Sequence, residues 1–327
     1  MLEHGGRLRE AATRWDIPLR QWLDLSTGIA PWSYPADISA AAWGRLPEDD
    51  DGLEAAAAGY YGHPAPLPLP GSQAAIQALP RLFAPGIAVL PAPTYGEYAP
   101  AWRAAGHEVR EVAADEWVAA DADILMLANP NNPTGTSFAP DLLHGLAQRQ
   151  AARDGWLVVD EAFADAMPET SLAAQAGIEL PRLVVLRSLG KFFGLAGARV
   201  GFLCAEPALR QRMAETLGPW VVAHPSREAA RQALADSVWQ TGQRQRLESA
   251  CARLGTLLAG RDLGSVDGGG LFRYVLTAPA VALYDFLARR GILVRLFRQP
   301  EALRFGLPAN ETDWQRLDAA LTDWKHS

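Results

Sequence analysis

Cysteine is scarce in this sequence of 327 residues, which contains only Cys204 and Cys251. Two cysteines so far apart in the chain argue against a disulfide scaffold and against a cysteine-based metal site. The six histidines are scattered and show no HExxH-like ligand spacing. We therefore expect a protein without a metal centre.

Apolar and basic runs are also short. No apolar run approaches the roughly 18 residues that a membrane-spanning helix needs. The N-terminal stretch MLEHGGRLRE carries charges where a signal peptide needs an apolar core. The formal net charge of −7 gives nucleic-acid binding little electrostatic support. The sequence therefore predicts a cytoplasmic protein that binds neither membranes nor nucleic acids.

Short apolar runs alternate with helical stretches through the middle of the chain. The runs that we expect to be buried strands are GIAVLPAP, ADILMLANP, GWLVVDEAF, RLVVLRSLG and ARVGFLCA. Helical stretches such as DLLHGLAQRQAARD fit between them. This alternation predicts an α/β fold, with a large domain whose mostly parallel sheet is flanked by helices.

Lys191 stands alone among apolar residues in the stretch SLGKFFGLAGAR. A buried ammonium is costly unless it is paired or loses its proton. One interpretation is a surface lysine on an apolar loop. The other is a lysine kept neutral so that it can attack a carbonyl and form a Schiff base. The segments NPNNPTG, DEAF and SLGK each follow a predicted strand, where parallel sheets gather their chemistry.

The motifs ANPNNPTG, VVDEAF and SLGKFFGLAGAR, in this order, resemble those of the aspartate-aminotransferase superfamily of fold type I. The resemblance extends over most of the chain and implies pyridoxal 5'-phosphate as cofactor. It implies that Lys191 forms a Schiff base with the cofactor aldehyde and that Asp160 pairs with the pyridinium nitrogen. A carboxylate there keeps the ring protonated, so that the ring accepts electrons. Asn132 would donate to the ring's 3-oxygen. The alternative for Asp160 is a helix or turn cap, and Asn132 could also serve as a turn residue in its proline-rich loop.

The stretch PLPLPGSQAAIQALPRLF predicts a helix after a turn at Gly71 and Ser72. Free amides at the start of a helix bind anions, although the stretch alone could simply be a well-capped helix. The resemblance implies that the cofactor phosphate is held by Gly71, Ser72, Gln73, Ser188 and Arg199.

Two aromatic positions are also implied by the resemblance. Tyr95, in PAPTYGEY, would stack on the pyridine ring, although it could also be ordinary core packing. Tyr60, in YYGHP, would reach the phosphate of a neighbouring subunit, and Tyr61 could take this role instead. A homodimer with shared active sites follows from that match.

The resemblance also extends to the substrate. Arg304, in ALRFGLP, matches an arginine that grips the α-carboxylate of an amino acid through a planar, bidentate contact. The opening EHGGRLREAA, followed by WLDLSTGIAPWSYP, resembles threonine-phosphate decarboxylases of cobalamin biosynthesis. That resemblance implies a substrate-binding set of His4, Gly5, Gly6, Gly28 and Arg295, with Arg298 as a weaker candidate. Ala30 departs from the asparagine that this family often has.

The chain is longer than one compact core of usual size, so we expect more than one domain. Residues 46–218 would form the large cofactor-binding domain, and residues 219–327 a smaller α+β C-terminal domain. Residues 1–45 would form an N-terminal arm that contributes to the small domain and the active site.

The implied activity is decarboxylation of L-threonine O-3-phosphate to (R)-1-aminopropan-2-yl phosphate, a carbon–carbon lyase reaction. Its catalytic residues would be Lys191 and Asp160. Only the N-terminal resemblance favours this activity over a histidinol-phosphate-type aminotransferase that acts on a phosphorylated amino substrate. A third alternative is a catalytically silent regulatory protein of the same fold.

Phe163 departs from the superfamily pattern and generates a prediction. Many aminotransferases have tyrosine three residues after the aspartate, as a second donor to the cofactor's 3-oxygen, and phenylalanine cannot donate. We expect the pKa of the Schiff-base nitrogen to be higher here than in relatives with tyrosine, because Asn132 is left as the donor. A pH titration of the cofactor absorbance measures it, and a pKa at or below that of those relatives would contradict the expectation.

Overall fold

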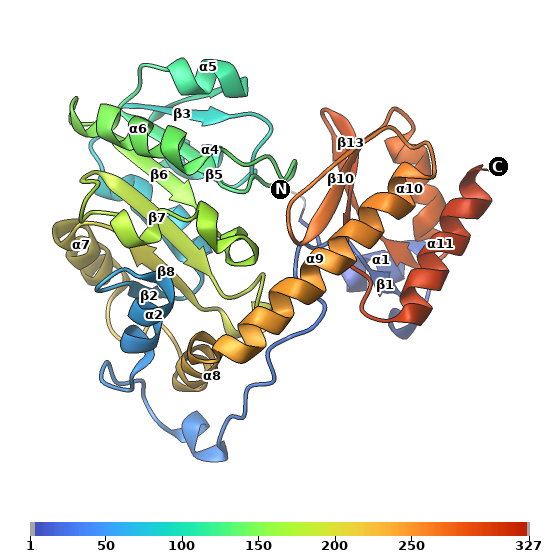
Figure 1. Ribbon diagram of the computed structural model, residues 1–327, viewed down its shortest axis with the longest axis horizontal. Helices are drawn as coiled ribbons and strands as arrows, with labels where there is room; N and C mark the ends of the chain where they lie inside the picture. Colours follow the sequence, from blue (N-terminus) through green and yellow to red (C-terminus); the bar gives the residue numbers. More distant parts are fainter. Residues whose placement is uncertain (1–3, 326–327) are drawn as a thin grey trace. The chain divides into compact units, whose positions relative to one another are not determined.

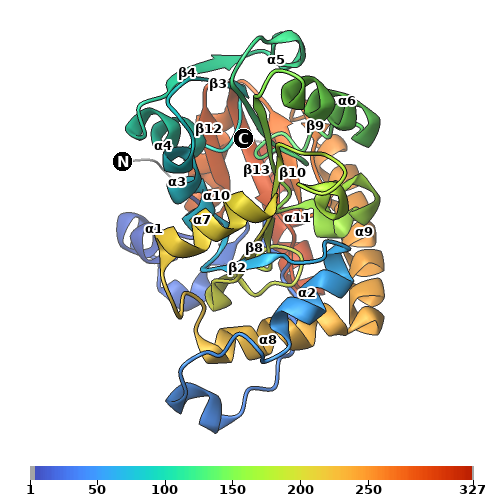
Figure 2. The same cartoon turned by 90° about the vertical axis from the view of Figure 1, so that its left-hand side faces the viewer.

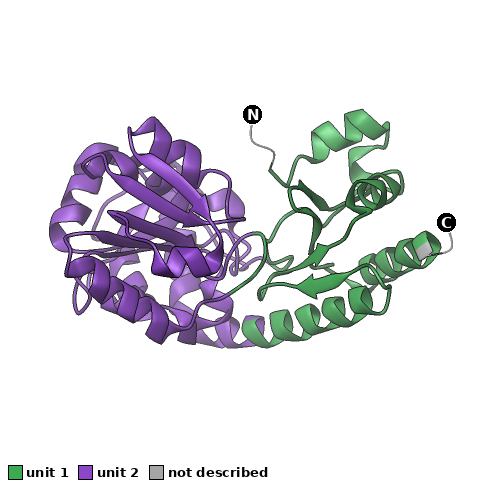
Figure 3. Cartoon of the chain, turned by 90° about the horizontal axis from the view of Figure 1, so that it is seen from above, with its two compact units in different colours: residues 1–32, 133–136, 244–327 green, residues 33–132, 137–243 purple. Residues whose placement is uncertain are grey.

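The computed structural model describes residues 4–325, which fall into two compact units (Figure 3). Unit 1 comprises residues 1–32, 133–136 and 244–327, and unit 2 comprises residues 33–132 and 137–243. These units differ from the predicted domains, whose boundaries were placed after residues 45 and 218. The predicted boundaries concern folding domains and stay a prediction. Residues 219–243 belong with unit 2, where helix α8 (His224–Ala235) packs on helix α2 (Leu53–Tyr61).

Unit 2 is built on a seven-stranded sheet (Figure 1). In spatial order its strands are β2 (Leu67–Leu69), β8 (Gly201–Cys204), β7 (Leu183–Ser188), β6 (Trp156–Asp160), β5 (Ile124–Ala128), β3 (Ile87–Pro91) and β4 (Glu108–Val112). The five strands from β7 to β4 are parallel, whereas β8 and β2 run antiparallel to their neighbours. The five apolar runs expected to be strands are confirmed as β3, β5, β6, β7 and β8.

Helices lie on both faces of this sheet (Figure 2). Besides α2 and α8, unit 2 contains α3 (Ser72–Ala78), α4 (Tyr98–Ala104), α5 (Ala114–Ala119), α6 (Pro140–Ala151) and α7 (Pro207–Leu217). The unit boundary falls within the long helix α9 (Ser237–Ala259). Short 3-10 helices complete the described chain at Leu19–Gln21, Ala40–Gly44, Leu79–Leu82, Ala164–Ala166, Pro168–Thr170, Ala173–Gln175 and Ala196–Ala198.

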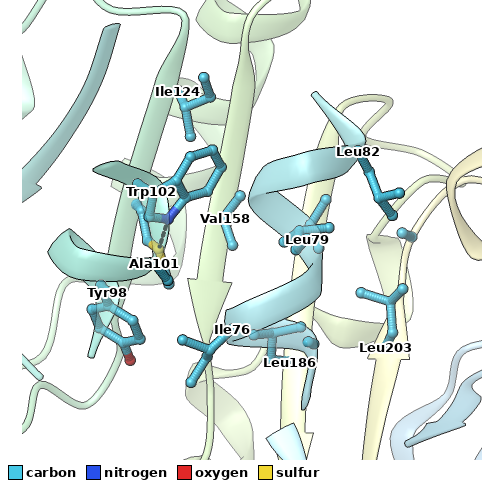
Figure 4. Close-up of a cluster of buried hydrophobic side chains, with 14 of the residues drawn as sticks. Ile76, Leu79, Leu82, Tyr98, Ala101, Trp102, Ile124, Val158, Leu186 and Leu203 are labelled. Carbon is cyan, nitrogen blue, oxygen red and sulfur yellow. Dashed lines mark hydrogen bonds between the residues drawn. The ribbon is translucent and has the colours of Figure 1, made fainter. Parts of the chain in front are cut away.

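The core on one face of the sheet joins α3, α4 and α7 to alternate strand residues (Figure 4). Side chains such as Val158 and Leu186 point to this face because successive strand residues alternate between the two faces. Trp102 is buried there, and its indole N–H lies 2.9 Å from the sulfur of Met126. Val159 and Val185, at the intervening positions, are also fully buried, so both faces of the sheet are covered.

Strand β2 is one element that the sequence analysis missed. No strand was expected before the turn at Gly71 and Ser72, yet Leu67–Leu69, in the proline-rich PLPLP, pairs antiparallel with β8. Pro68 lacks the N–H that a central strand needs, and β2 tolerates it because it lies at the sheet edge. The opposite edge, β4, was missed because its residues are mostly exposed and charged.

The parallel register brings the predicted polar motifs to the same edge of the sheet. Asp160, the last residue of β6, lies opposite Ala128 of β5 and Leu186 of β7. The backbone N–H of Asn129 donates to the carbonyl of Asp160 at 2.9 Å. The expectation that each of the three motifs follows a strand is confirmed, and the three strands β5, β6 and β7 are neighbours in the sheet.

Unit 1 contains a four-stranded antiparallel sheet and a two-stranded parallel one. The first has the order β12 (Arg295–Arg298), β13 (Glu301–Gly306), β10 (Phe272–Leu276) and β9 (Ser265–Asp267), and the second pairs β1 (Leu23–Asp24) with β11 (Ile292–Leu293). Its further helices are α1 (Leu8–Trp15), α10 (Ala280–Ala288) and α11 (Glu311–Lys325). Ala11 of α1 is buried with Ala288 and Leu293, so the N-terminal helix is part of this unit's core.

No helix within residues 4–325 is long and apolar enough to cross a membrane. Over the same residues, no three His, Cys, Asp or Glu side chains gather closely enough to hold a metal ion.

Gly177 should be a position where the fold tolerates no side chain. Its φ is +67°, and a Cβ would overlap the backbone of Ala205 and Glu206. We expect Gly177→Ala to lower the free energy of unfolding by at least about 2 kcal/mol. The matched control is Gly145→Ala in α6, where a Cβ meets nothing within 4 Å. That change should raise stability by up to about 1 kcal/mol. Denaturant unfolding measures both, and equal effects would contradict the assignment.

Candidate active site

Lys191 lies in the turn that follows β7 and is partly buried. Its neighbours Leu189, Phe192 and Phe193 are fully buried in unit 2. The Lys191 Nζ atom lies 5.5 Å from the centre of the Phe163 ring. The amine therefore faces an aromatic ring, and a cation–π contact of this kind favours the protonated form of a lysine.

Asp160 is only 4% exposed, and both of its carboxylate oxygens accept hydrogen bonds. The Tyr98 hydroxyl donates to Oδ2 at 2.8 Å, and the Ala162 N–H donates to Oδ1 at 2.9 Å. Burial raises the pKa of Asp160, while these two hydrogen bonds and the charges of Lys191 and Arg187 oppose the rise. One oxygen thus caps a turn, and the side chain as a whole is a buried carboxylate close to Lys191.

The predicted phosphate-binding residues come together where α3 meets β8. Gly71 has a φ of +80°, and a Cβ there would lie 2.7 Å from Nη2 of Arg199. A Cβ on Gly201 would lie 2.6 Å from the N–H nitrogen of Ser72, and Ser188 is the cross-strand partner of Gly201. The glycines let backbone amides, a hydroxyl and a guanidinium gather in a small space, which fits a phosphate group.

Gln73 and Tyr95 form a hydrogen-bonded chain beside this cradle. The Tyr95 hydroxyl donates to Oε1 of Gln73 at 3.1 Å, and the Gln73 amide donates to Glu97 at 3.4 Å. The side chain of Gln73 therefore orients the Tyr95 ring. The backbone N–H of Gln73 is then the group that could bind phosphate.

The loop that carries Asn132 is anchored on both sides. Asn129 exchanges two hydrogen bonds with the backbone of Phe138, at 2.8 and 3.3 Å. Asn131 donates to the carbonyl of Pro93 at 2.9 Å and accepts from the Thr94 hydroxyl at 3.1 Å. These contacts fix the backbone next to Asn132 against the loop that leads to Tyr95.

The two adjacent tyrosines of α2 have different environments. Tyr61 is buried, and its ring lies 4.7 Å from the guanidinium carbon of Arg187. Tyr60 is partly exposed and packs edge-on against Phe193, with ring centres 5.6 Å apart. Of the two, Tyr60 is the side chain that a second subunit could reach.

A buried ionic cluster lies beneath these residues, and the sequence analysis missed it. Arg187 contacts Glu161 at 2.5 Å and also pairs with Asp165, and the three side chains are at most 3% exposed. Burial alone would lower the pKa of Arg187, but the charges of Asp165 and Glu161 hold it well above its ordinary value. The available signal was Arg187, the second arginine of RLVVLRS, which directly follows four apolar residues of a predicted buried strand, much as Lys191 stands among apolar residues.

Unit 1 contains a cationic pocket of about 280 Å³ that includes three of the predicted substrate residues, His4, Gly5 and Arg295. The weaker candidate Arg298 also lines it. Gly6 does not, and its N–H donates to the Ser26 hydroxyl at 2.7 Å. The remaining lining residues are Arg7, Glu10, Ala11, Arg14, Ser26, Tyr284, Leu293, Val294 and Leu296. Four arginines against one glutamate make this pocket suitable for an anion.

Arg304 lies on β13 directly opposite Arg295 of β12. It is 7% exposed, and its Nη2 donates to the carbonyl of Ser26 at 3.1 Å. Residues opposite each other in an antiparallel pair share a face of the sheet, so two guanidinium-bearing side chains stand side by side. Gly28 is buried and lies three residues after Leu25. The Leu25 carbonyl accepts a hydrogen bond from the N–H of Gly306, at the end of β13.

Comparison with known proteins places the chain in a family. The family model described as "Aminotransferase class I and II" matches residues 47–323. The chain belongs to the class I and II aminotransferase family. It is 56% identical to threonine-phosphate decarboxylase of Pseudomonas aeruginosa over 99% of this chain and 98% of that protein. It is 42% identical to the protein of the same name from a Sinorhizobium species, over 97% of each chain.

The fold also matches solved structures of the family. Histidinol-phosphate aminotransferase from Sinorhizobium meliloti, determined in complex with pyridoxal 5'-phosphate, superposes with a TM-score of 0.84 at 20% identity. The match covers 99% of this chain and 95% of that one. The predicted fold type and the resemblance to threonine-phosphate decarboxylases are both confirmed.

Asp160→Asn should change the stability of the cofactor-free protein in a pH-dependent way. Because burial raises the pKa of Asp160, the parent loses stability as the pH rises from about 4 through the raised value. Asparagine does not titrate, so the stability of the variant relative to the parent should rise as the pH increases above about 4. Urea unfolding over a series of pH values from about 4 upward measures this, and a stability difference that does not change with pH would contradict it.

Proposed function

We propose that this chain is a pyridoxal 5'-phosphate-dependent lyase that decarboxylates L-threonine O-3-phosphate to (R)-1-aminopropan-2-yl phosphate, a step of cobalamin biosynthesis. Relatives at 56% and 42% identity over nearly the whole chain carry the name threonine-phosphate decarboxylase. The enzyme would be cytoplasmic and would bind neither membranes nor nucleic acids, and the formal net charge of −7 gives nucleic-acid binding little electrostatic support.

The observation that carries the proposal is the position of Arg304 opposite Arg295 in unit 1. Like charges directly opposite each other destabilise a sheet. A substrate with a carboxylate at one end and a phosphate at the other supplies two anionic groups to this face. Arg304 would hold the carboxylate, and Arg295 with His4 would hold the phosphate. An amino acid without phosphate would leave the cationic pocket of about 280 Å³ without its ligand.

Unit 2 contains residues that fit the cofactor. Asp160 would hold the protonated ring nitrogen, Tyr95 would stack on the ring, and Asn132 would donate to its 3-oxygen. The cofactor phosphate would be held by Gly71, Ser72, Gln73, Ser188 and Arg199. When bound, the cofactor supplies an acceptor for the electrons released at the substrate Cα.

The protein groups then determine which bond breaks and where the proton goes. Arg304 would bind the α-carboxylate and set the direction of its bond to Cα. Lys191 would bind the cofactor aldehyde and later deliver a proton from Nζ to Cα in place of the lost carbon dioxide. The Phe163 ring near Lys191 would stabilise the protonated amine that this delivery needs.

A homodimer with shared active sites is part of the proposal. Tyr60 is the candidate for contact with the phosphate of a neighbouring subunit. Trp43, Leu46 and Trp220 of unit 2 are 75%, 62% and 62% exposed. Large apolar side chains with this much exposure mark surfaces that a second copy could cover.

A histidinol-phosphate-type aminotransferase is the second candidate. Histidinol-phosphate aminotransferase of Cronobacter sakazakii is 34% identical over 71% of this chain. Both activities would use the same lysine, aspartate and phosphate-binding residues. The third alternative, a catalytically silent protein of this fold, is less well supported, because the chain has Lys191, Asp160, Asn132 and Arg199 together.

Incubation with L-threonine O-3-phosphate tests the proposal directly. We expect the holoenzyme to release carbon dioxide and aminopropanol phosphate in equal amounts without a keto-acid acceptor. Amino transfer to 2-oxoglutarate without release of carbon dioxide would support the aminotransferase instead, and no turnover in either assay would support the silent protein.

His4→Ala and Arg295→Ala should weaken use of the phosphorylated substrate selectively. Each removes a donor to the charged phosphate worth about 1.5–3 kcal/mol, so kcat/KM should fall roughly ten- to hundredfold. Reaction with plain threonine should hardly change, because threonine lacks the phosphate. Arg9→Ala, an exposed α1 arginine that does not line the pocket, is the matched control. Equal losses on both substrates would show that His4 and Arg295 serve folding rather than phosphate binding.

A further inference from the structure

Tyr98 has no assigned role, yet its hydroxyl is the side-chain donor to Asp160. The residue begins α4 and is 1% exposed. Its hydroxyl lies 2.8 Å from Oδ2 of Asp160. We propose that Tyr98 is a positioning residue that keeps Asp160 ionised and aimed at the cofactor ring nitrogen. The inference rests on the proposed function, because it assigns Asp160 the role of ring partner.

The geometry explains why a hydroxyl is needed here. The Ala162 N–H holds Oδ1 at 2.9 Å, so the hydroxyl of Tyr98 holds the other oxygen of the same carboxylate. These two donors, which come from different segments, hold the Asp160 carboxylate in one orientation and favour its ionised form. A carboxylate that keeps only a backbone donor in a buried site is free to rotate and is easier to protonate.

The direction of the hydrogen bond follows from the charges around it. Asp160 faces Tyr98 from α4, Arg187 from β7 and Lys191 from the turn after β7. Burial and the neighbouring Asp160 charge raise the pKa of Tyr98 well above its ordinary value. The phenol therefore stays protonated and donates, so that the negative charge remains on Asp160.

Tyr98 also connects two residues of the proposed cofactor site. Its ring packs edge-on against that of Tyr95, with centres 5.3 Å apart. The ring expected to stack on the cofactor and the carboxylate expected to pair with the ring nitrogen therefore share Tyr98 as a common support. Phenylalanine at position 98 would keep the aromatic support and remove only the hydrogen bond.

Tyr98→Phe is the test, and the chain offers a matched control. Tyr61 is also a buried tyrosine of unit 2, but its hydroxyl has no hydrogen-bond partner among the residues that the structure describes. Tyr61→Phe therefore deletes the same atom without changing Asp160. Melting temperatures of both cofactor-free variants establish that each is folded.

Pyridoxine 5'-phosphate is the probe for the first measurement, because it has the cofactor's ring nitrogen but no aldehyde to react with Lys191. Protonation of Asp160 at low pH should weaken its binding. Without the Tyr98 hydroxyl the pKa of Asp160 rises, so the weakening should begin at a higher pH in Tyr98→Phe than in the parent and in Tyr61→Phe. Coincident binding profiles of the two variants would overturn the proposal.

Steady-state kinetics of the holoenzyme give the second measurement. Tyr98→Phe should lower kcat about ten- to hundredfold, while KM for L-threonine O-3-phosphate stays within about twofold. A rise in KM with unchanged kcat would contradict a role at Asp160. The binding measurement needs no substrate, so a failure of the proposed substrate and a failure of the Tyr98 assignment remain distinguishable.

A double variant separates the hydrogen bond from general damage to the fold. In an Asp160→Asn background there is no carboxylate for Tyr98 to keep ionised. Adding Tyr98→Phe should therefore produce no further shift in the pH dependence of pyridoxine 5'-phosphate binding. A further shift of the size seen in the single Tyr98→Phe variant would overturn the proposal.

Discussion

Arg187 joins four segments of unit 2 at a place shielded from water. Its guanidinium pairs with Glu161, which follows β6, and with Asp165 in the next turn, and it lies against the ring of Tyr61 on α2. Glu161 also accepts the N–H of Leu172 at 2.7 Å. Two of these segments adjoin a residue proposed to contact the cofactor, since Asp160 precedes Glu161 and Ser188 follows Arg187 along the chain. The geometry of the cofactor site thus depends on this ionic contact.

A buried ion pair of this kind is not explained by stability alone. Removing three charged groups from water costs free energy that offsets much of their mutual attraction. Proteins with apolar residues of equal volume in place of such groups are often as stable. Removing one partner is different, because it leaves an uncompensated charge in the interior. The cluster therefore favours one arrangement of β6, β7 and α2 over others, and that arrangement sets where Asp160 and Ser188 lie.

The sequence predicted those features of the fold and the site that a local pattern of residues determines. The buried strands and the residues directly after them were found because apolar runs and polar motifs are readable within a few positions. Strand β2 was missed because Pro68 is permitted only at a sheet edge, and edge position is a tertiary property. Tyr98 was missed because its contact with Asp160 joins residues 62 positions apart. The cationic pocket was only partly predicted, because Arg7 and Arg14 reach it through the placement of α1 on α10.

The two opposed arginines of β12 and β13 give unit 1 a thermodynamic property. Binding of the proposed doubly anionic ligand and folding of this sheet would be linked equilibria, because the ligand would bind the paired strands and not the separated ones. Ligand concentration would therefore contribute to the free energy that holds β12 on β13. Where the ligand is scarce, this sheet would lose that contribution, and the protein's resistance to unfolding would become a measure of substrate supply.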